Sequence, residues 1–346
     1  MKWFPFIGFL ILILTGCQKE KISFSTEADD IFYLDNQGAS MKIMVQGNTL
    51  SKNYILFVHG GPGSNSELFN TDYISSHLEN KYACVYWDQR NAGASQGGSN
   101  GCRMHLSQYA DDLKKVIQLL KYRYGADISV FLLGHSFGGL VTSAFLTTGD
   151  NQDMVKAWIC VDGSHNYPLN DTLTHDKLLN AGQQQIALNS NVGKWSEIVQ
   201  YCKNHNGNFS LDESNQLGSY GEEAESLFPE VNKFDLLGQV EKYAISQDYP
   251  LTSMAVNYLY SSNSSLNSEL ATANFSPLMN KIHIPVVLFW GRYDFICPVG
   301  LAYDIMDRTA SNDKKIVFFE HSGHNCIFQE EEKFCSELSS FIDLHP

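Results

Sequence analysis

Short, uninterrupted apolar runs recur along the chain and set the strongest limit on its fold. They lie at residues 54–58, 83–87, 128–133, 157–161, 286–290 and 316–319. Runs of this length without polar alternation are typical of strands that are covered on both faces. Amphipathic stretches separate many of them, and strand–helix alternation of this kind predicts a mostly parallel, doubly wound α/β sheet with right-handed crossovers.

The clearest amphipathic stretch lies between the second and third runs. It predicts a helix over residues 107–124, because Tyr109, Leu113 and other apolar side chains share one helical face. Ser107 is placed to cap this helix and Gly125 to end it. The helix has the length that a crossover between parallel strands requires.

Residues 165–275 interrupt the alternation. They contain no convincing central strand, are rich in Asn, Ser, Gln and Glu, and carry several helical patterns. A segment of this length is not expected to be a structureless loop inside a compact domain. We therefore predict a mostly helical cap over one end of the sheet, which divides the core into residues 30–164 and 276–346.

The first residues have the features of a targeting segment. Lys2 precedes an apolar run, and Leu-Thr-Gly stands directly before Cys17. The run is shorter than the roughly 20 apolar residues of a spanning helix. Residues 1–16 resemble a bacterial lipoprotein signal peptide, which implies cleavage before Cys17, acylation of its thiol and a linker over residues 17–29. We expect a lipid-anchored protein of the bacterial cell envelope whose soluble domain lies outside the cytoplasm; the alternative is an ordinary secretory signal.

The charge balance argues against one class of partner. The chain carries 38 acidic and 24 basic residues, for a formal net charge of -14. Such a surface repels phosphate backbones, so we expect no nucleic-acid partner.

The sharpest local motif is Gly-His-Ser-Phe-Gly at residues 134–138. It directly follows the apolar run at residues 128–133 and precedes a helical run. In this context Ser136 is expected on a strained strand-to-helix turn, with its hydroxyl exposed at the carboxyl edge of the sheet. Flanking glycines suit such a turn because neighbouring backbone leaves no room for a Cβ. We predict that Ser136 is a nucleophile.

A serine nucleophile requires a base and a group that orients the base. His324 follows the last apolar run, and Asp294 follows the run at residues 286–290. The order Ser, Asp, His along the chain is the order expected for this strand–turn–helix motif. Asp162, which ends the run at residues 157–161, is the alternative acid, and we favour Asp294.

An oxyanion hole is expected beside the nucleophile. One donor would be the N–H of Phe137 and the other an N–H from the loop after the first apolar run. That loop reads His-Gly-Gly-Pro-Gly at residues 59–63. We assign Gly61 as the second donor, because glycines let a loop turn its N–H groups inward.

Together these motifs resemble the proline iminopeptidase branch of the α/β hydrolases. The resemblance covers roughly residues 54–165 and 284–330, and it rests on the motifs above with Trp-Asp-Gln-Arg at residues 87–90 and Gly-Arg-Tyr-Asp at residues 291–294. It implies an α/β-hydrolase fold with a helical cap, the triad and oxyanion donors already named, and no metal or organic cofactor.

The chain departs from that family at particular positions. Phe137 stands where proline iminopeptidases commonly carry Trp, and Asn91 replaces the glycine of the family's Asp-Gln-Arg-Gly turn. Family members bind the free α-amine of the substrate with cap carboxylates. Glu222, Glu223 and Glu225 are the candidate anchors here, and the alternative for them is a solvated helical face.

We expect a serine hydrolase that forms an acyl-enzyme. The favoured function is an aminopeptidase of the proline iminopeptidase type that acts on short peptides. A small-molecule esterase or amidase is the alternative. A non-catalytic binding protein on a hydrolase fold is more remote, because the triad residues and both oxyanion loops are all present.

Overall fold

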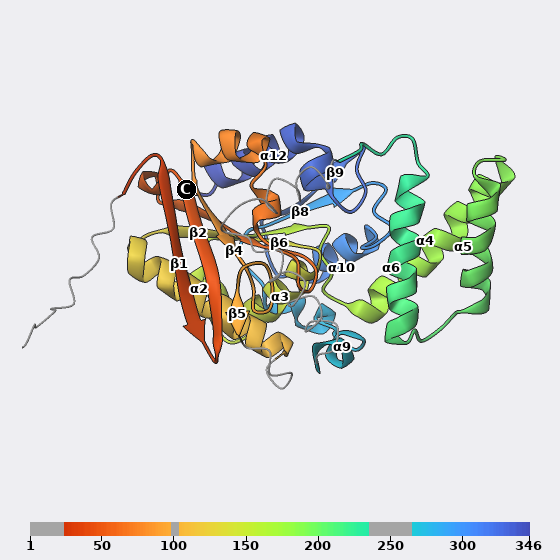
Figure 1. Cartoon of the computed structure of the whole chain (residues 1–346), viewed down its shortest axis with the longest axis horizontal. Helices are drawn as coiled ribbons and strands as arrows, with labels where there is room; N and C mark the ends of the chain where they lie inside the picture. The colour runs from red at the N-terminus through yellow and green to blue at the C-terminus, as the bar shows by residue number, and fades with distance from the viewer. Residues whose placement is uncertain (1–23, 98–103, 235–264) are drawn as a thin grey trace, which may run out of the picture.

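The computed structural model describes residues 24–97, 104–234 and 265–346 (Figure 1). The predicted signal peptide and Cys17 lie outside the described residues, as does most of the predicted linker. The same holds for residues 235–264 of the predicted cap.

A single sheet forms the centre of the molecule, and its fold class is the predicted one. Its strands are β1 (Ala28–Asn36), β2 (Ala39–Gly47), β3 (Asn53–Val58), β4 (Ala83–Trp87), β5 (Gln96–Gly97), β6 (Ser129–His135), β7 (Ala157–Val161), β8 (Val286–Gly291) and β9 (Lys314–Phe319). The order is β1-β2-β4-β3-β6-β7-β8-β9, with β5 paired to β2. Strands β3, β4 and β6 to β9 pair in parallel, while β1 and β2 are antiparallel. Each apolar run of the sequence is therefore a parallel strand.

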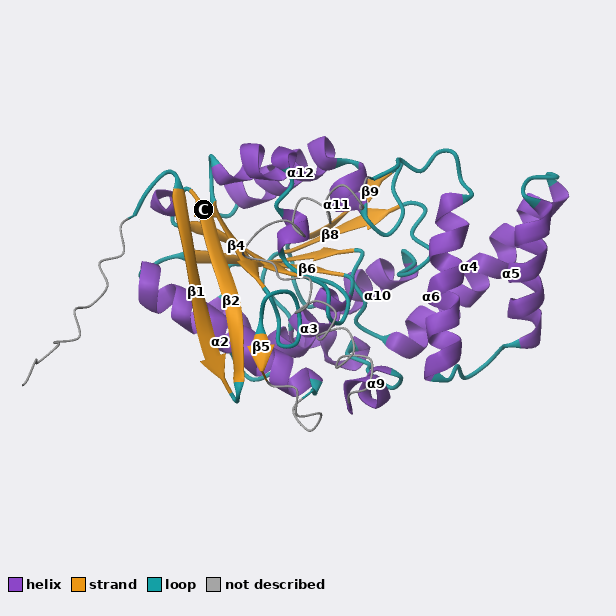
Figure 2. Ribbon diagram, viewed as in Figure 1, coloured by secondary structure: helices purple, strands orange, loops and turns teal. Residues whose placement is uncertain are grey.

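Helices cover both faces of this sheet (Figure 2). The helices outside the cap are α1 (Asp72–Ile74), α2 (Leu106–Tyr124), α3 (Phe137–Leu146), α10 (Gly300–Arg308), α11 (Cys326–Gln329) and α12 (Glu331–Asp343). In β3, Leu56 packs in one apolar cluster with α2, α3 and α10, whereas Ile55 packs in a second cluster with α1 and α12. Burial on both faces explains why these strands lack polar alternation.

The start of α2 differs from the prediction. The helix begins at Leu106, so Ser107 lies inside it and is not its cap. The N–H of Leu106 donates instead to the Glu269 carboxylate at 2.8 Å, which supplies a partner for one unpaired donor of the first turn. At the other end, Gly125 follows the last helical residue with φ 113°, as predicted.

Helices also fill the described part of the segment between β7 and β8. They are α4 (Tyr167–Ala187), α5 (Val192–Asn204), α6 (Leu211–Ser226) and α9 (Ser265–Leu270). Helices α4 to α6 stand together beyond one end of the sheet (Figure 1) and share an apolar cluster that includes Leu178, Trp195 and Leu217. Phe295, from the loop after β8, belongs to the same cluster, so this helical layer packs directly on that loop.

Candidate active site

Ser136 occupies the turn between β6 and α3. Its φ of 54° is in the left-handed region, which is strained for a residue with a side chain. The turn is tight enough that a Cβ on Gly134 would lie 2.6 Å from the carbonyl oxygen of Gly138. A Cβ on Gly138 would collide with the carbonyl oxygen of Val58, at the end of β3. The two flanking glycines are therefore required by close backbone contacts.

Three side chains from separate loops form a hydrogen-bonded series. The Ser136 hydroxyl lies 2.8 Å from Nε2 of His324, and Nδ1 of His324 lies 3.1 Å from Oδ2 of Asp294. Oδ1 of Asp294 accepts the N–H groups of Ile296 and Cys297 at 2.8 and 2.7 Å. Asp294 is fully buried. The carboxylate is thus held on both oxygens, with one of them directed at the imidazole.

Asp162, the alternative acid, lies close by but has different partners. Its two oxygens accept the N–H groups of Gly291 and Cys326 at 2.8 and 3.2 Å. Burial and the neighbouring Asp294 carboxylate raise the pKa of Asp162 to about 7. Asp294 is therefore the carboxylate that contacts His324, and Asp162 joins the end of β8 to the start of α11.

The surrounding charges determine the protonation of His324. Burial alone lowers its pKa, but the Asp294 carboxylate, with Asp162 and Glu225, outweighs burial and raises that pKa to about 9. His135, beside Ser136 in the chain, behaves in the opposite way. Burial and the charge of His324 lower the pKa of His135 to about 3. Nε2 of His135 donates to the carbonyl oxygen of His324 at 2.9 Å, which ties the two loops together.

The loop after β3 lies against the serine. A Cβ on Gly60 would come within 3.0 Å of Cβ of Ser136, and Gly61 has φ 119°. Phe137 is the first residue of α3, so its N–H has no partner within the helix. Neither the Gly61 nor the Phe137 N–H donates to a backbone acceptor in the part of the chain that the structure describes.

Buried polar contacts hold this loop and the Asp-Gln-Arg turn in place. The Gln89 side chain donates to the carbonyl oxygen of His59 at 2.7 Å. Nη2 of Arg90 donates to the buried carboxylate of Asp112 at 2.7 Å. Asn91, where the family has glycine, adopts φ 51°. Asparagine tolerates this left-handed conformation, so the turn survives the substitution.

The three cap glutamates do not converge. Glu222 is exposed, and Glu223 forms an ion pair with Lys194 at 2.7 Å. Glu225 is buried instead, with Oε1 accepting the N–H of Phe295 at 2.9 Å and Oε2 accepting the N–H of His324 at 3.0 Å. The three candidate amine anchors therefore have different surroundings, and Glu225 contacts the loops around His324.

Sequence reasoning did not find Lys177 of α4. Its ammonium group donates to the carbonyl oxygen of Asp294 at 2.8 Å and lies 4.5 Å from the centre of the Phe295 ring. Burial lowers the pKa of Lys177. No motif marks this lysine, because its contact depends on how α4 packs against a loop more than 100 residues away.

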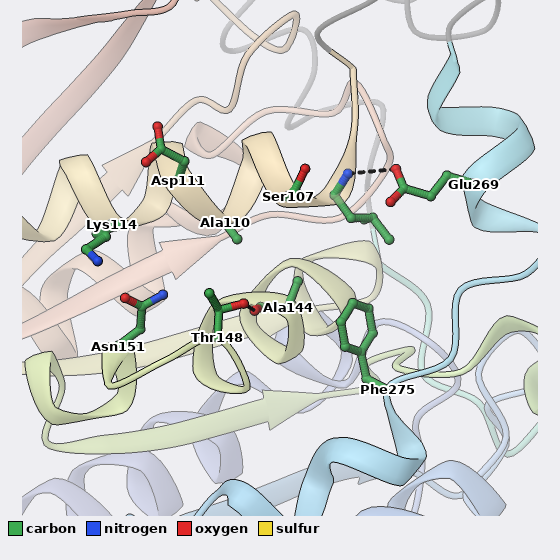
Figure 3. Close-up of a pocket in the computed structure, with 10 residues that line it drawn as sticks. Ser107, Ala110, Asp111, Lys114, Ala144, Thr148, Asn151, Glu269 and Phe275 are labelled. Carbon is green, nitrogen blue, oxygen red and sulfur yellow. Dashed lines mark hydrogen bonds between the residues drawn. The ribbon is translucent and has the colours of Figure 1, made fainter.

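A cavity of about 410 Å³ lies elsewhere, between α2, α3 and α9 (Figure 3). Ala110 of α2 and Ala144 of α3 line it together with Lys114, Asn151 and Glu269. Ser136, His324 and Asp294 are not among its lining residues. This cavity is therefore separate from the site around Ser136.

Comparison with known proteins agrees with this fold. A family model described as the alpha/beta hydrolase fold matches residues 53–331. "Probable aminopeptidase YbaC" of Bacillus subtilis is 22% identical over 311 residues, which cover 88% of this chain and 93% of that protein. "Proline iminopeptidase" of Saccharolobus solfataricus is 22% identical over 302 residues, covering 85% and 86%. The solved esterase of Exiguobacterium antarcticum shares the fold, with a TM-score of 0.53 at 22% identity over 88% of this chain and 96% of that one.

The chain belongs to the α/β-hydrolase family. The predicted resemblance to its proline iminopeptidase-like branch is confirmed, and the chain is a hydrolase. The curated proteins that it resembles over most of its length are named as a probable aminopeptidase and a proline iminopeptidase. Among the described helices, none is long and apolar enough to cross a membrane.

Proposed function

We propose that this protein is a serine hydrolase in which Ser136, His324 and Asp294 form the catalytic triad. The observation that carries the proposal is the contact of 2.8 Å between the Ser136 hydroxyl and Nε2 of His324, on a ring whose Nδ1 faces Asp294. A serine hydroxyl is a weak nucleophile by itself, and this arrangement provides the base and the group that orients it.

This geometry supports the following proposed reaction. His324 accepts the proton of Ser136 as the serine oxygen attacks the substrate carbonyl. The N–H groups of Gly61 and Phe137 are proposed to stabilise the resulting oxyanion, and neither donates to a backbone acceptor among the described residues, which supports this role. His324 then protonates the leaving group. A water molecule, deprotonated by the same histidine, attacks the acyl-enzyme and releases the acid.

For the substrate we propose short peptides with a free amino end, which makes the enzyme an aminopeptidase. The support is the similarity of nearly the whole chain to proteins named as aminopeptidase and proline iminopeptidase. A small-molecule esterase or amidase is the second candidate. The specific observation that favours it is that Glu225 is buried and that each of its oxygens accepts a backbone N–H from the core loops.

One labelling experiment tests the serine mechanism. Wild-type protein should react with a fluorophosphonate probe, whereas Ser136→Ala should not react and should lose ester hydrolysis, with a melting temperature close to wild type. A folded wild-type protein that is not labelled would favour the binding-protein alternative. Near wild-type turnover by Ser136→Ala would refute the nucleophile.

An assay panel then separates the two substrate classes. It contains prolyl and other aminoacyl naphthylamides, their N-acylated forms and short-chain nitrophenyl esters. An aminopeptidase should turn over the free-amine compounds at least tenfold faster than the blocked ones, since one charge-assisted contact is worth roughly 1.5–3 kcal/mol. Equal turnover of the blocked compounds would favour the esterase or amidase.

We also propose that a lipid on Cys17 holds the protein at the bacterial cell envelope. The support is the charged start, the short apolar run and the Leu-Thr-Gly-Cys sequence of the first residues. In a bacterial host, wild-type protein should incorporate labelled fatty acid and sediment with membranes. Cys17→Ser should do neither, and equal membrane association of this variant would reject the lipid anchor.

A further inference from the structure

Glu225 connects the helical cap to both loops that carry the triad partners of Ser136. It lies near the end of α6, and its side chain is buried, with only 7% of the residue exposed. Oε1 accepts the N–H of Phe295, the residue after Asp294, and Oε2 accepts the N–H of His324 itself. One carboxylate from the cap therefore holds the backbone of two loops that are separate in sequence.

The packing around this carboxylate is close. A Cβ on Gly323 would collide with Oε2 of Glu225, so the residue before His324 must be small for the carboxylate to reach the loop. On the same helix, a Cβ on Gly221 would lie 2.8 Å from the carbonyl oxygen of Phe295. The Phe295 ring stacks on Phe228 with ring centres 5.6 Å apart. Helix α6 and the loop after β8 thus form one packed unit.

We propose that Glu225 is a positioning residue: through it, the packing of α6 on the core determines how His324 is aligned with Asp294. It acts through the main chain, since its oxygens meet backbone N–H groups at 2.9 and 3.0 Å. The inference rests on the proposed triad. It gives Glu225 a different role from that of an amine anchor, because its contacts on both oxygens are to backbone N–H groups of the core loops.

The charge of Glu225 also bears on His324. The carboxylate interacts with Asp294 from the loop after β8, Lys177 from α4 and Cys297, while Asp162 adds a further carboxylate around the same imidazole. Burial and the Asp294 carboxylate raise the pKa of Glu225 to about 8. Glu225 in turn helps to raise the pKa of His324. Loss of this carboxylate should therefore lower the pKa of the base.

The central variant is Glu225→Gln, which removes the charge and presents an amide NH₂ to one of the two N–H donors. For a small nitrophenyl ester, kcat should fall roughly tenfold to a hundredfold, because a small displacement of a catalytic group has an effect of that size. KM should stay within about twofold, since no substrate contact is lost. The ascending limb of the pH profile of kcat/KM should move to lower pH, because it reports the pKa of the free base.

Two further variants separate the effect of the Glu225 charge from the effect of its hydrogen bonds to the two loops. Glu225→Asp keeps the charge but shortens the reach, so kcat should fall while the pH profile stays closer to that of wild type. Asp212→Asn removes an exposed carboxylate from the same helix and should change neither quantity. Wild-type kcat in Glu225→Gln would overturn the proposal. So would a loss confined to KM for free-amine substrates, because that would make Glu225 a substrate ligand.

Hydrogen exchange tests the same inference without turnover. In Glu225→Gln, the amides of Phe295 and His324 should exchange faster than in wild type, and those in β6 should not change. Unchanged exchange in both loops would reject the coupling. If wild-type protein fails to react with the fluorophosphonate probe, the proposed triad fails, while this exchange result still decides whether Glu225 holds the loops. Glu225→Asp serves for both measurements if Glu225→Gln does not fold.

Discussion

At the scale of single residues, the choice between two aspartates defines the site. Both lie at the carboxyl edge of the sheet, because β7 and β8 are paired neighbours and each aspartate follows one of them. The contact of 3.1 Å from His324 to Asp294 distinguishes them, since the Asp162 oxygens accept backbone N–H groups. The two carboxylates should therefore fail in different ways when they are replaced.

Replacement of each aspartate by asparagine tests this difference. Asp294→Asn should lower kcat by roughly 10³- to 10⁴-fold, because the orientation and charge that support the imidazole are lost. Asp162→Asn should keep kcat within about tenfold of wild type but lower the melting temperature, as it disturbs contacts to Gly291 and Cys326. The measurements are ester turnover at saturation and thermal unfolding. An equal loss of kcat in both variants would contradict the assignment.

At the scale of elements, the turn between β6 and α3 depends on backbone contact with β3. Gly138 sits against the carbonyl of Val58, directly before the loop that contains Gly61. No alternative side chain fits there without moving one of the two elements. The position of the loop after β3 and the position of Ser136 are thus set by the same contact.

Gly138→Ala should displace both the loop after β3 and the turn that carries Ser136. The added methyl group should reduce the free energy of unfolding by roughly 1–3 kcal/mol, which is typical of overpacking, and it should reduce kcat by displacing the loop. Gly193→Ala in α5 is the matched control, because nothing lies within 4 Å of its added Cβ. Alanine is the better helix former, so this control should gain up to about 1 kcal/mol. Urea unfolding measures the free energy of unfolding of each variant. Equal values for the two variants would contradict this prediction.

At the scale of the whole molecule, the folded protein retains protons that the unfolded chain would release. The pKa of Glu225 rises from 4.5 to about 8, and that of Asp162 from 3.8 to about 7. The pKa of His324 rises from 6.5 to about 9. A raised pKa in the folded state means that the associated stability is present at low pH and is lost as pH rises through the folded value.

Stability should therefore fall as the pH rises from about 6.5 to 9, above the range in which the lowered pKa of His135 acts in the opposite direction. The loss from Asp162 and Glu225 extends from about pH 4 to 8, and the loss from His324 from about pH 6.5 to 9. The melting temperature should be several degrees lower at pH 9 than at pH 6, and Glu225→Gln should show a smaller difference. Calorimetry at constant ionic strength measures both values. A melting temperature that is constant or rises between these pH values would contradict the claim that Asp162, Glu225 and His324 retain protons in the folded state.

Much of the fold follows from local sequence. Residues 83–87 and 157–161 are buried strands with the predicted bounds, since an apolar run of that length and an adjacent turn are local properties. The elbow around Ser136 is also local, because its strand, glycines and helix are contiguous. The predicted start of α2 was wrong by one residue. The N–H of its first residue is bonded by Glu269 from the distant helix α9, which the local sequence does not reveal.

By itself the sequence predicted the parallel strands, the serine turn, and a histidine and an aspartate at the same edge of the sheet. Only the tertiary structure showed which aspartate contacts His324, and that the carboxylate of Glu225 accepts N–H groups from two core loops. The reason is physical. Local runs and turns depend on neighbours in the chain, whereas Glu225 meets partners 70 and 99 residues away, and such contacts exist only once the cap has packed on the core.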